Sequence, residues 1–510
     1  MKSNYRRVIS NLLSRISKNG VWSRINKISA SGYFFIFIVA FFILQASWIA
    51  ISTAYPMIFD EYYHFGLTQL YSHQFLPFIT SQPPDSMMYG DVTRYGSYLA
   101  HYLMSFLLRI VELFTDDTTK QIIMLRLFNV GVFATAIVIF RTVLKRSGIL
   151  SAINNITLLL FTLLPVTSLL AATINYDNFM ILGFAIFIMM GQILIIEASK
   201  GRVSFHSVAI FISVGLLTSL VKSSFLPILF AGVLFLIFIF IKQRRQLNLM
   251  RTLKPTIGVK FFLTCLLLIL SVGLFAERYG GNTLMYKTPV PDCQKVLSIE
   301  TCLGSHPWER NYVRRMKVKD ASREDLVGPV SYFISPWLVS MVSGNNISAA
   351  DSAGGIPQNI GRPLPIVNDA IWILFAIVTI ALIVRFRKII SGTYIKFVFI
   401  CLIAYTGALF YMNYSQYTQL HTPVAISARY LLPFLPLLIA IGLSAAVQIV
   451  KSRIIHIVAS LILIILMTQG GGFTSYIINS NPSWFWGKQK VIDANNIMKQ
   501  AVDLVVKDSI

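Results

Sequence analysis

The chain has 510 residues, of which 55% are hydrophobic and only 13% are charged, about half the charged share of an average soluble domain. Repeated apolar stretches of about 20 residues exclude a soluble globular fold and predict an all-α polytopic membrane protein. The formal net charge of +23 does not indicate nucleic-acid binding, because the cations lie in short loops between apolar segments, as the positive-inside rule describes for cytoplasmic loops.

The N-terminal 30 residues contain seven Lys or Arg and no acidic residue. Val8, Leu12 and Ile16 recur at helical spacing, which predicts a basic amphipathic helix on the cytoplasmic leaflet; a disordered basic tail is the alternative. The next apolar run, residues 33–52, is too long for the apolar region of a signal peptide and lacks a small-residue cleavage site. It is therefore the first predicted span.

About 11 membrane spans are predicted from the apolar runs, and one doubtful segment, residues 98–114, decides their orientation. If this segment stays on the outer surface, 17 Lys or Arg of the later loops lie on the cytoplasmic side. Of the 21 acidic residues, only Glu197 lies on that side. If it crosses, all these cations move outside, against the orientation bias. The predicted spans are residues 33–52, 122–140, 152–173, 177–196, 206–221, 223–241, 257–276, 367–384, 394–412, 430–449 and 453–469.

This topology places the N-terminus in the cytoplasm and the elaborated loops outside, so we expect extracytoplasmic chemistry. The aromatic stretch at residues 480–490 is predicted to be an interfacial anchor. The predicted units are a basic cytoplasmic segment (1–30), an N-terminal transmembrane module (31–276) whose first outer loop (53–121) carries membrane-surface helices, an extracytoplasmic loop (277–362), C-terminal transmembrane helices (363–470) and an extracytoplasmic tail (471–510).

Four cysteines are present. Cys265 and Cys401 lie in apolar spans and are interpreted as packing residues. Cys293 and Cys302 lie in the second outer loop, where an oxidising compartment would permit a disulfide. The spacing alone leaves that pairing open.

Two adjacent carboxylates, Asp60 and Glu61, follow the first span in "YPMIFDEYYHFG". A carboxylate at the edge of a bilayer is costly unless it is paired, hydrated or used. It could accept a proton from a substrate hydroxyl or ligate a cation; the alternative is an acidic cap on the following helix. His64 follows on the same helical face and could orient a carboxylate.

A second acid, Asp177 in "AATINYDNFMILG", lies where two predicted spans meet on the outer face. It is a candidate for the same chemistry as Asp60. Helix capping is the alternative, and Asn175 and Asn178 beside it could share that role.

Two cations stand near the outer ends of spans. Lys222 interrupts the apolar run "LLTSLVKSSFLPILF", and Arg429 begins a late span in "AISARYLLPFLPLL". Both could bind a phosphate, Arg in bidentate fashion and Lys as a point charge; snorkelling to lipid headgroups is the alternative. Arg126 in "MLRLFN" is a further candidate, for which a structural role is favoured.

These motifs, in this order, resemble the type C glycosyltransferase superfamily (GT-C). The resemblance covers residues 30–450 and rests on "FDEYYH", "RLFNVGVFATAIVIFRTVLKR", "NYDNFMILGFAIFI", "LVKSSFLPIL" and "ARYLLPFLPLLIAIG". It is greatest to bacterial families described as protein mannosyltransferase-like or aminoarabinose transferase-like. Many relatives carry an acidic–Pro pair followed by "KPP" in the first outer loop, whereas this chain has "SQPPDSMMYGD" without a Lys.

The resemblance implies an inverting glycosyltransferase that moves a sugar from a polyprenyl-phosphate donor to an extracytoplasmic lipid, glycan or protein. It assigns the base to Asp60 with Glu61 beside it, an acceptor or metal role to Asp177, and phosphate binding to Lys222 and Arg429. No cofactor is required, although a divalent metal remains open. We expect these residues to converge at one outward-facing cavity. The alternative is a transporter or flippase of a lipid-linked or anionic substrate.

Overall fold

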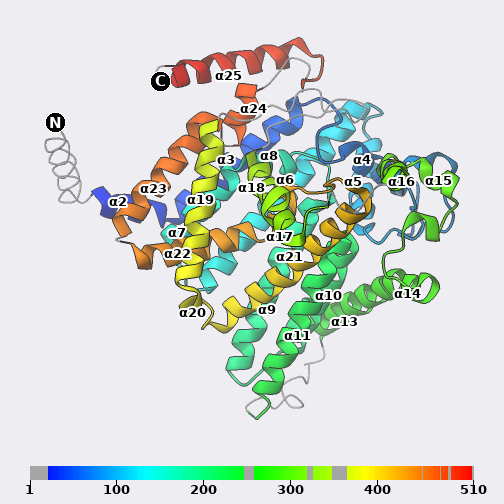
Figure 1. Ribbon diagram of the computed structural model, residues 1–510, viewed down its shortest axis with the longest axis horizontal. Helices are drawn as coiled ribbons and strands as arrows, with labels where there is room; N and C mark the ends of the chain where they lie inside the picture. The colour runs from blue at the N-terminus through cyan, green and yellow to red at the C-terminus, as the bar shows by residue number, and fades with distance from the viewer. Residues whose placement is uncertain are drawn as a thin grey trace.

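The computed structural model describes residues 21–245, 258–318, 326–346, 365–450, 452–470, 472–479 and 484–507 (Figure 1). Within these ranges the chain forms helices and loops and no strand. The predicted amphipathic helix at Val8, Leu12 and Ile16 lies outside the described residues. The rest of that basic segment contains helix α2 (Val21–Ser29).

Seven helical segments in the described chain are long and apolar enough to cross a membrane, which makes the chain an all-helical integral membrane protein. An eighth span would be the pair α7 (Ser151–Leu163) and α8 (Pro165–Ala171), which is bent by 72°. Three further predicted spans match shorter apolar helices, α10 (Phe205–Val221), α22 (Leu435–Ile449) and residues Ile457–Thr468. The seven segments are α3 (Gly32–Ser52), α6 (Thr118–Arg146), α9 (Tyr176–Ser199), Ser223–Lys242 with α11 (Leu226–Lys242), Val259–Tyr286 with α13 (Val259–Phe275) and α14 (Gly281–Tyr286), α19 (Pro365–Val384) and α21 (Thr393–Leu420).

A layer of shorter helices covers one end of the bundle. In Figure 1, helices α4 (Glu61–Ser72) and α5 (Leu99–Glu112) lie near α15 (Ile299–Leu303) and α16 (His306–Val318), away from α2 and from α20 (Phe386–Ile389). With 14 residues, α5 is shorter than the roughly 20 residues of a span, and it packs along α4. The surface position expected for residues 98–114 stays a prediction. A disulfide joins Cys293 and Cys302 in this layer.

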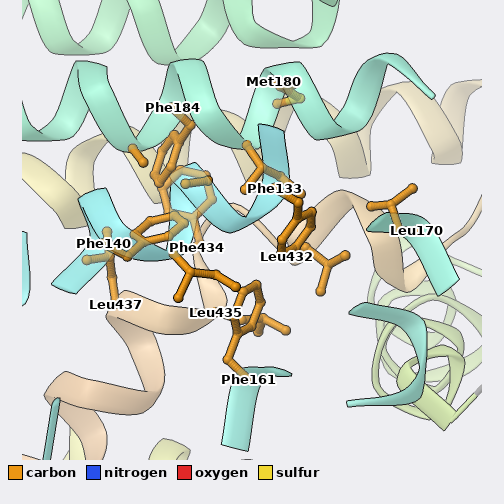
Figure 2. Packing of buried hydrophobic residues seen from close by; sticks show 14 of the residues in the cluster. Phe133, Phe140, Phe161, Leu170, Met180, Phe184, Leu432, Phe434, Leu435 and Leu437 are labelled. Carbon is orange, nitrogen blue, oxygen red and sulfur yellow. The ribbon is translucent and has the colours of Figure 1, made fainter. Parts of the chain in front are cut away.

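The core of the bundle connects the middle of the chain with its late helices. Figure 2 shows aromatic side chains from α6, α7 and α9 packed around Phe434, which directly precedes α22. The rings of Phe184 and Phe434 lie 4.4 Å apart between centroids. The short helix η8 (Ala428–Leu431) lies just before Phe434 in the sequence and carries Arg429, whose side chain lies beside Asp177 in the first turn of α9.

The C-terminal tail packs on the C-terminal end of α3. Trp484 and Phe485 are 5% exposed, and the amide of Ala54 donates a hydrogen bond to the carbonyl of Trp484 at 2.7 Å. These rings are therefore buried packing residues, which corrects the prediction of an interfacial anchor there; residues 480–483 of that stretch are outside the described chain. The remaining α-helices of the described chain are α17 (Pro329–Tyr332), α18 (Val339–Ser343), α23 (Ser452–Ile465), α24 (Phe473–Asn479) and α25 (Gln489–Lys507).

Candidate functional site

Four charged residues that are distant in the sequence meet at one end of the bundle. Arg429 donates from Nη2 to Oδ2 of Asp60 at 3.1 Å, and its Nε lies 3.6 Å from Oδ2 of Asp177. The ammonium of Lys222 donates to Oδ1 of Asp177. The result is a continuous chain of alternating charge, Asp60–Arg429–Asp177–Lys222, which we call the charge chain.

Exposure changes along the charge chain. The side chain of Asp60 is 61% exposed, whereas that of Arg429 is 9% exposed. Asp177 and Lys222 are also buried, with 4% and 8% of their side chains exposed. A ligand can therefore reach the carboxylate of Asp60 from solvent, while the two cations lie in an environment of lower dielectric, where electrostatic interactions are stronger.

Helix capping does not account for either acid. Asp60 precedes α4 but makes no side-chain capping bond. The start of α9 is capped by Asn175, whose Oδ1 accepts a hydrogen bond from the amide of Asp177 at 2.8 Å. The two carboxylates are thus free to pair with Arg429 and Lys222.

Snorkelling does not account for Lys222 either. Its ammonium lies over the rings of Tyr176 and Tyr430, at 4.7 Å and 4.4 Å from their centroids. Cation–π contacts of this kind hold a desolvated cation in place. Lys222 therefore points into the protein rather than toward lipid headgroups.

The backbone before α4 is strained. Phe59 and Asp60 have φ angles of 67° and 62°, and non-glycine residues rarely adopt this left-handed region, which costs about 1–3 kcal/mol per residue. Asn175 supports this turn by donating from Nδ2 to the carbonyl of Phe59 at 2.8 Å. The turn aims the side chain of Asp60 at Arg429, and strain of this kind is concentrated at functional sites.

Arg429 retains buried donors without a hydrogen-bond partner. Its Nη1 and Nε atoms are both buried and unbonded within the described chain, although Nε faces Asp177. An unpaired buried donor of a charged group is costly. Phosphate oxygens match a guanidinium with free N–H groups in bidentate fashion, which makes Arg429 a candidate to donate to an anionic ligand.

Glu61 has a different role from its neighbour. It is fully buried, and both its oxygens accept from Arg126, at 2.8 Å from Nε and 2.7 Å from Nη2. The amides of Met57 and Ile174 donate to it as well, at 2.6 Å and 3.1 Å. This placement corrects the expectation that Glu61 shares the chemistry of Asp60, because its acceptor positions are occupied; it positions the turn instead.

Arg126 joins the segments around that turn. Besides Glu61, its guanidinium donates to the carbonyls of Ala50, Thr53 and Ala54 at the end of α3. Arg126 therefore holds the end of α3 and the turn before α4 together, which is the structural role that the sequence favoured.

His64 contacts another histidine rather than a carboxylate. Its Nδ1 lies 2.8 Å from Nε2 of His101, and the two rings stack with centroids 5.2 Å apart. Burial and the neighbouring His101 lower the pKa of His64 well below its usual value, and burial lowers the pKa of His101 to about 3. The expectation that His64 orients a carboxylate is corrected, since the two histidines form a neutral buried pair between α4 and α5.

We expect this pair to make stability depend on pH. An unfolded histidine titrates near pH 6.5, so below that pH the unfolded chain binds more protons than the folded one and stability falls. For His101 alone, the loss between pH 7.5 and pH 5 is about 2 kcal/mol. Thermal unfolding of the purified protein in detergent, followed across this range, measures the effect.

The control for this experiment is His73, which is exposed at the end of α4. His73→Gln should keep the pH dependence of the unfolding temperature, whereas His101→Asn should reduce it, with the remainder coming from His64. An equal slope in His101→Asn and in the unmodified protein would contradict the assignment.

Further groups near the charge chain were not singled out from the sequence. Tyr63 and Tyr95 share a side-chain hydrogen bond, and burial is the main cause that raises the pKa of Tyr95. Burial and the nearby Arg314 lower the pKa of Arg310 on α16, while Asp60 acts in the opposite direction, so Arg310 lies within electrostatic range of Asp60. The signal for Arg310 was the basic run "RNYVRRMKVK" in the second outer loop.

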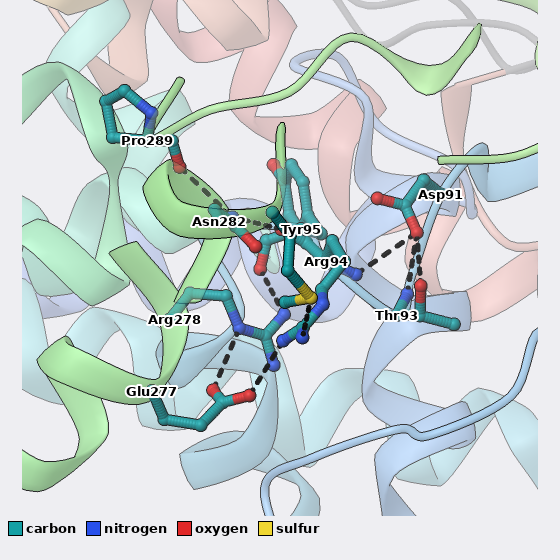
Figure 3. A network of polar contacts seen from close by, with 9 residues as sticks. Asp91, Thr93, Arg94, Tyr95, Glu277, Arg278, Asn282 and Pro289 are labelled. Carbon is teal, nitrogen blue, oxygen red and sulfur yellow. Dashed lines mark hydrogen bonds and ion pairs between the residues drawn. The ribbon is translucent and has the colours of Figure 1, made fainter. Parts of the chain in front are cut away.

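A polar cavity of about 400 Å³ lies between the two outer loops. Arg94 in its wall pairs with Glu277 at 2.9 Å, and Arg278 donates to the carbonyl of Tyr95 at 2.8 Å, as Figure 3 shows. Its lining does not include the four residues of the charge chain. This cavity is therefore not the single cavity that was expected to join the four residues of the charge chain.

The described residues contain no cluster of three or more His, Cys, Asp or Glu side chains that could hold a metal ion. Of the three acids considered for a metal, Glu61 is paired with Arg126, whereas Asp60 and Asp177 both face Arg429. In this arrangement a cation already occupies the space between the two carboxylates.

No protein-family model matches this chain, and no curated protein matches it in sequence. The resemblance to the GT-C superfamily consequently depends on the order of its motifs.

Proposed function

We propose that this protein is an inverting, integral-membrane glycosyltransferase of the GT-C type, which transfers a sugar from a polyprenyl-phosphate donor to an extracytoplasmic acceptor. The observation that supports the proposal most directly is the charge chain. It combines one exposed carboxylate, Asp60, with two buried cations, Lys222 and Arg429, at one end of the bundle.

In the proposed reaction, Asp60 accepts the proton of an acceptor hydroxyl. The acceptor oxygen forms a bond to the anomeric carbon from the face opposite the phosphate, and the bond between that carbon and the phosphate oxygen breaks. The electron pair leaves with polyprenyl phosphate, and the configuration at the anomeric carbon is inverted. Arg429 and Lys222 stabilise the negative charge that develops on the leaving phosphate.

The unbonded Nη1 of Arg429 supports this assignment, because it leaves a donor for a phosphate oxygen without first breaking the pair with Asp60. Asp177 holds Lys222 and faces Arg429. Its proposed role is to keep both cations at one depth. Glu61 and Arg126 keep the turn that carries Asp60 in place.

The proposal includes the membrane topology. Eleven spans, with the N-terminus in the cytoplasm, would place the charge chain at the outer leaflet, where the phosphate of a polyprenyl lipid lies. The seven long helices, the bent pair and the three shorter helices supply the segments, and the positive-inside bias gives their direction.

A transporter or flippase is the second candidate, favoured by the break at Lys222. Helix α10 ends at Val221 and Lys222 has an extended backbone with φ −151° and ψ 120°. Interrupted helices with polar groups are typical of transporter sites, which lie near the midplane of the bilayer. The charge chain instead includes the exposed Asp60, which favours the enzyme.

The test is an assay of the purified protein in lipid nanodiscs with radiolabelled polyprenyl-phosphate sugars and a panel of envelope lipids and glycans. We expect the label to leave the lipid and appear in the acceptor with inverted anomeric configuration. A parallel assay in sealed vesicles follows movement of the intact donor between leaflets. Movement of uncleaved donor without sugar transfer would overturn the proposal in favour of a flippase.

A further inference from the structure

A second cavity, of about 250 Å³, lies at the end of the bundle opposite to the charge chain. Its walls come from the end of α6, the start of α21 and the face of α22, and they are mainly apolar. Leu144, Ile395, Leu437 and Ile441 are among the lining residues. At this size the cavity is smaller than the roughly 300–1,000 Å³ of sites that enclose a drug-sized ligand, so it would take part of a larger apolar molecule.

The rim of this cavity is basic. Arg385 and Lys388 line it, and no carboxylate does. One nitrogen of Arg385 donates to the carbonyl of Gln448 at 2.8 Å, but its Nε is buried and has no hydrogen-bond partner within the described chain. Lys145 and Arg146, in the last turn of α6, adjoin the lining residues Leu144 and Ser147. The rim therefore has an excess of positive charge and an unpaired donor.

The start of α21 adds further donors at the same place. Gly392 lines the cavity and is the capping residue of this 28-residue helix, and it provides no side-chain acceptor for the first helical amides. Unpaired amides at a helix N-terminus bind anions. Here these amides lie beside an apolar cavity and two cations. The amides and cations match a phosphate group, and the apolar walls match the acyl chains attached to it.

We infer that this cavity binds an anionic phospholipid, with the phosphate at Arg385, Lys388 and the start of α21 and part of an acyl chain between α21 and α22. Free phosphate would leave the apolar walls uncovered, and an uncharged lipid would leave the cations unpaired. Basic cavities between membrane helices are typical sites for anionic headgroups. The site is separate from the charge chain and does not depend on the proposed transferase activity.

Native mass spectrometry of the purified protein, titrated with dioleoyl-phosphatidylglycerol or dioleoyl-phosphatidylcholine, tests this inference. We expect tighter retention of phosphatidylglycerol. Each rim cation contributes about 1 kcal/mol near a charged lipid, or roughly 5-fold, so Arg385→Gln with Lys388→Gln should weaken retention about 25-fold. The control, Lys200→Gln with Arg202→Gln, removes two cations from the loop after α9, outside the cavity.

A second variant tests the apolar part of the site without changing charge. Ser444 lines the cavity, and Ser444→Leu should fill it and reduce phosphatidylglycerol retention. Equal losses in the two double variants would mean nonspecific attraction and would overturn the inference. So would unchanged retention in Ser444→Leu, or displacement of the lipid by millimolar inorganic phosphate, which would indicate a site for a soluble anion.

Discussion

Asp60→Asn is expected to lower sugar transfer from polyprenyl-phosphate donors by about 10²–10⁴-fold, the usual contribution of a general base. The amide keeps the size of the side chain and can still accept a hydrogen bond from Arg429, but it cannot take up the acceptor proton. Single-turnover transfer by the purified variant in nanodiscs measures the loss. The donor should still bind, because the cations proposed to hold its phosphate are unchanged.

The matched control is Asp85→Asn, since Asp85 is also an exposed acid of the first outer loop. It should leave transfer unchanged. The thermal unfolding temperature of Asp60→Asn should stay close to that of the unmodified protein, because asparagine can keep the hydrogen bond from Arg429 and Arg429 keeps Asp177 as an anionic neighbour. Full transfer activity in a folded Asp60→Asn protein would remove Asp60 from the mechanism.

Arg126→Met is expected to destabilise the fold by about 3–5 kcal/mol, because it leaves the carboxylate of Glu61 buried without its partner. Both side chains are fully buried in the structure, so water cannot replace the lost bonds. The carbonyls of Ala50, Thr53 and Ala54 lose their donor as well. Thermal and denaturant unfolding in detergent measure the effect.

Two comparisons make the interpretation specific. Lys120→Met, on the same helix, breaks an exposed pair with Asp117 and should cost less than about 1 kcal/mol. The double variant Glu61→Gln with Arg126→Met should be more stable than Arg126→Met alone, because the uncompensated charge is gone. If the double variant were the less stable of the two, Glu61 would not be the group that Arg126 neutralises.

Much of the fold follows from the sequence because membrane spans are specified locally. An apolar run of the right length has to satisfy its backbone hydrogen bonds internally, so it forms a helix wherever it is inserted. The segments predicted as spans accordingly coincide with helices, and the doubtful residues 98–114 form a short helix, α5, packed on α4. The prediction of an interfacial anchor is wrong at Trp484 and Phe485, because an aromatic composition suits both such an anchor and the buried packing that these two rings have.

The individual charged residues of the site could also be selected from the sequence, because a carboxylate or cation at the end of an apolar run needs a reason to be there. Their partners could not. Asp60 and Glu61 are adjacent and chemically similar, yet one is exposed beside Arg429 and the other is buried with Arg126. A left-handed turn at Phe59 and Asp60 separates them, and no local pattern specifies that turn.

The sequence by itself determined the all-helical membrane class and the candidate acids and cations, because both depend on hydropathy and charge along short stretches of chain. Only the tertiary structure decided that Asp60, Asp177, Lys222 and Arg429 form one charge chain and that His64 pairs with His101. These contacts join residues up to 369 positions apart. They join side chains from separate elements, so they are a property of the assembled bundle rather than of any one segment.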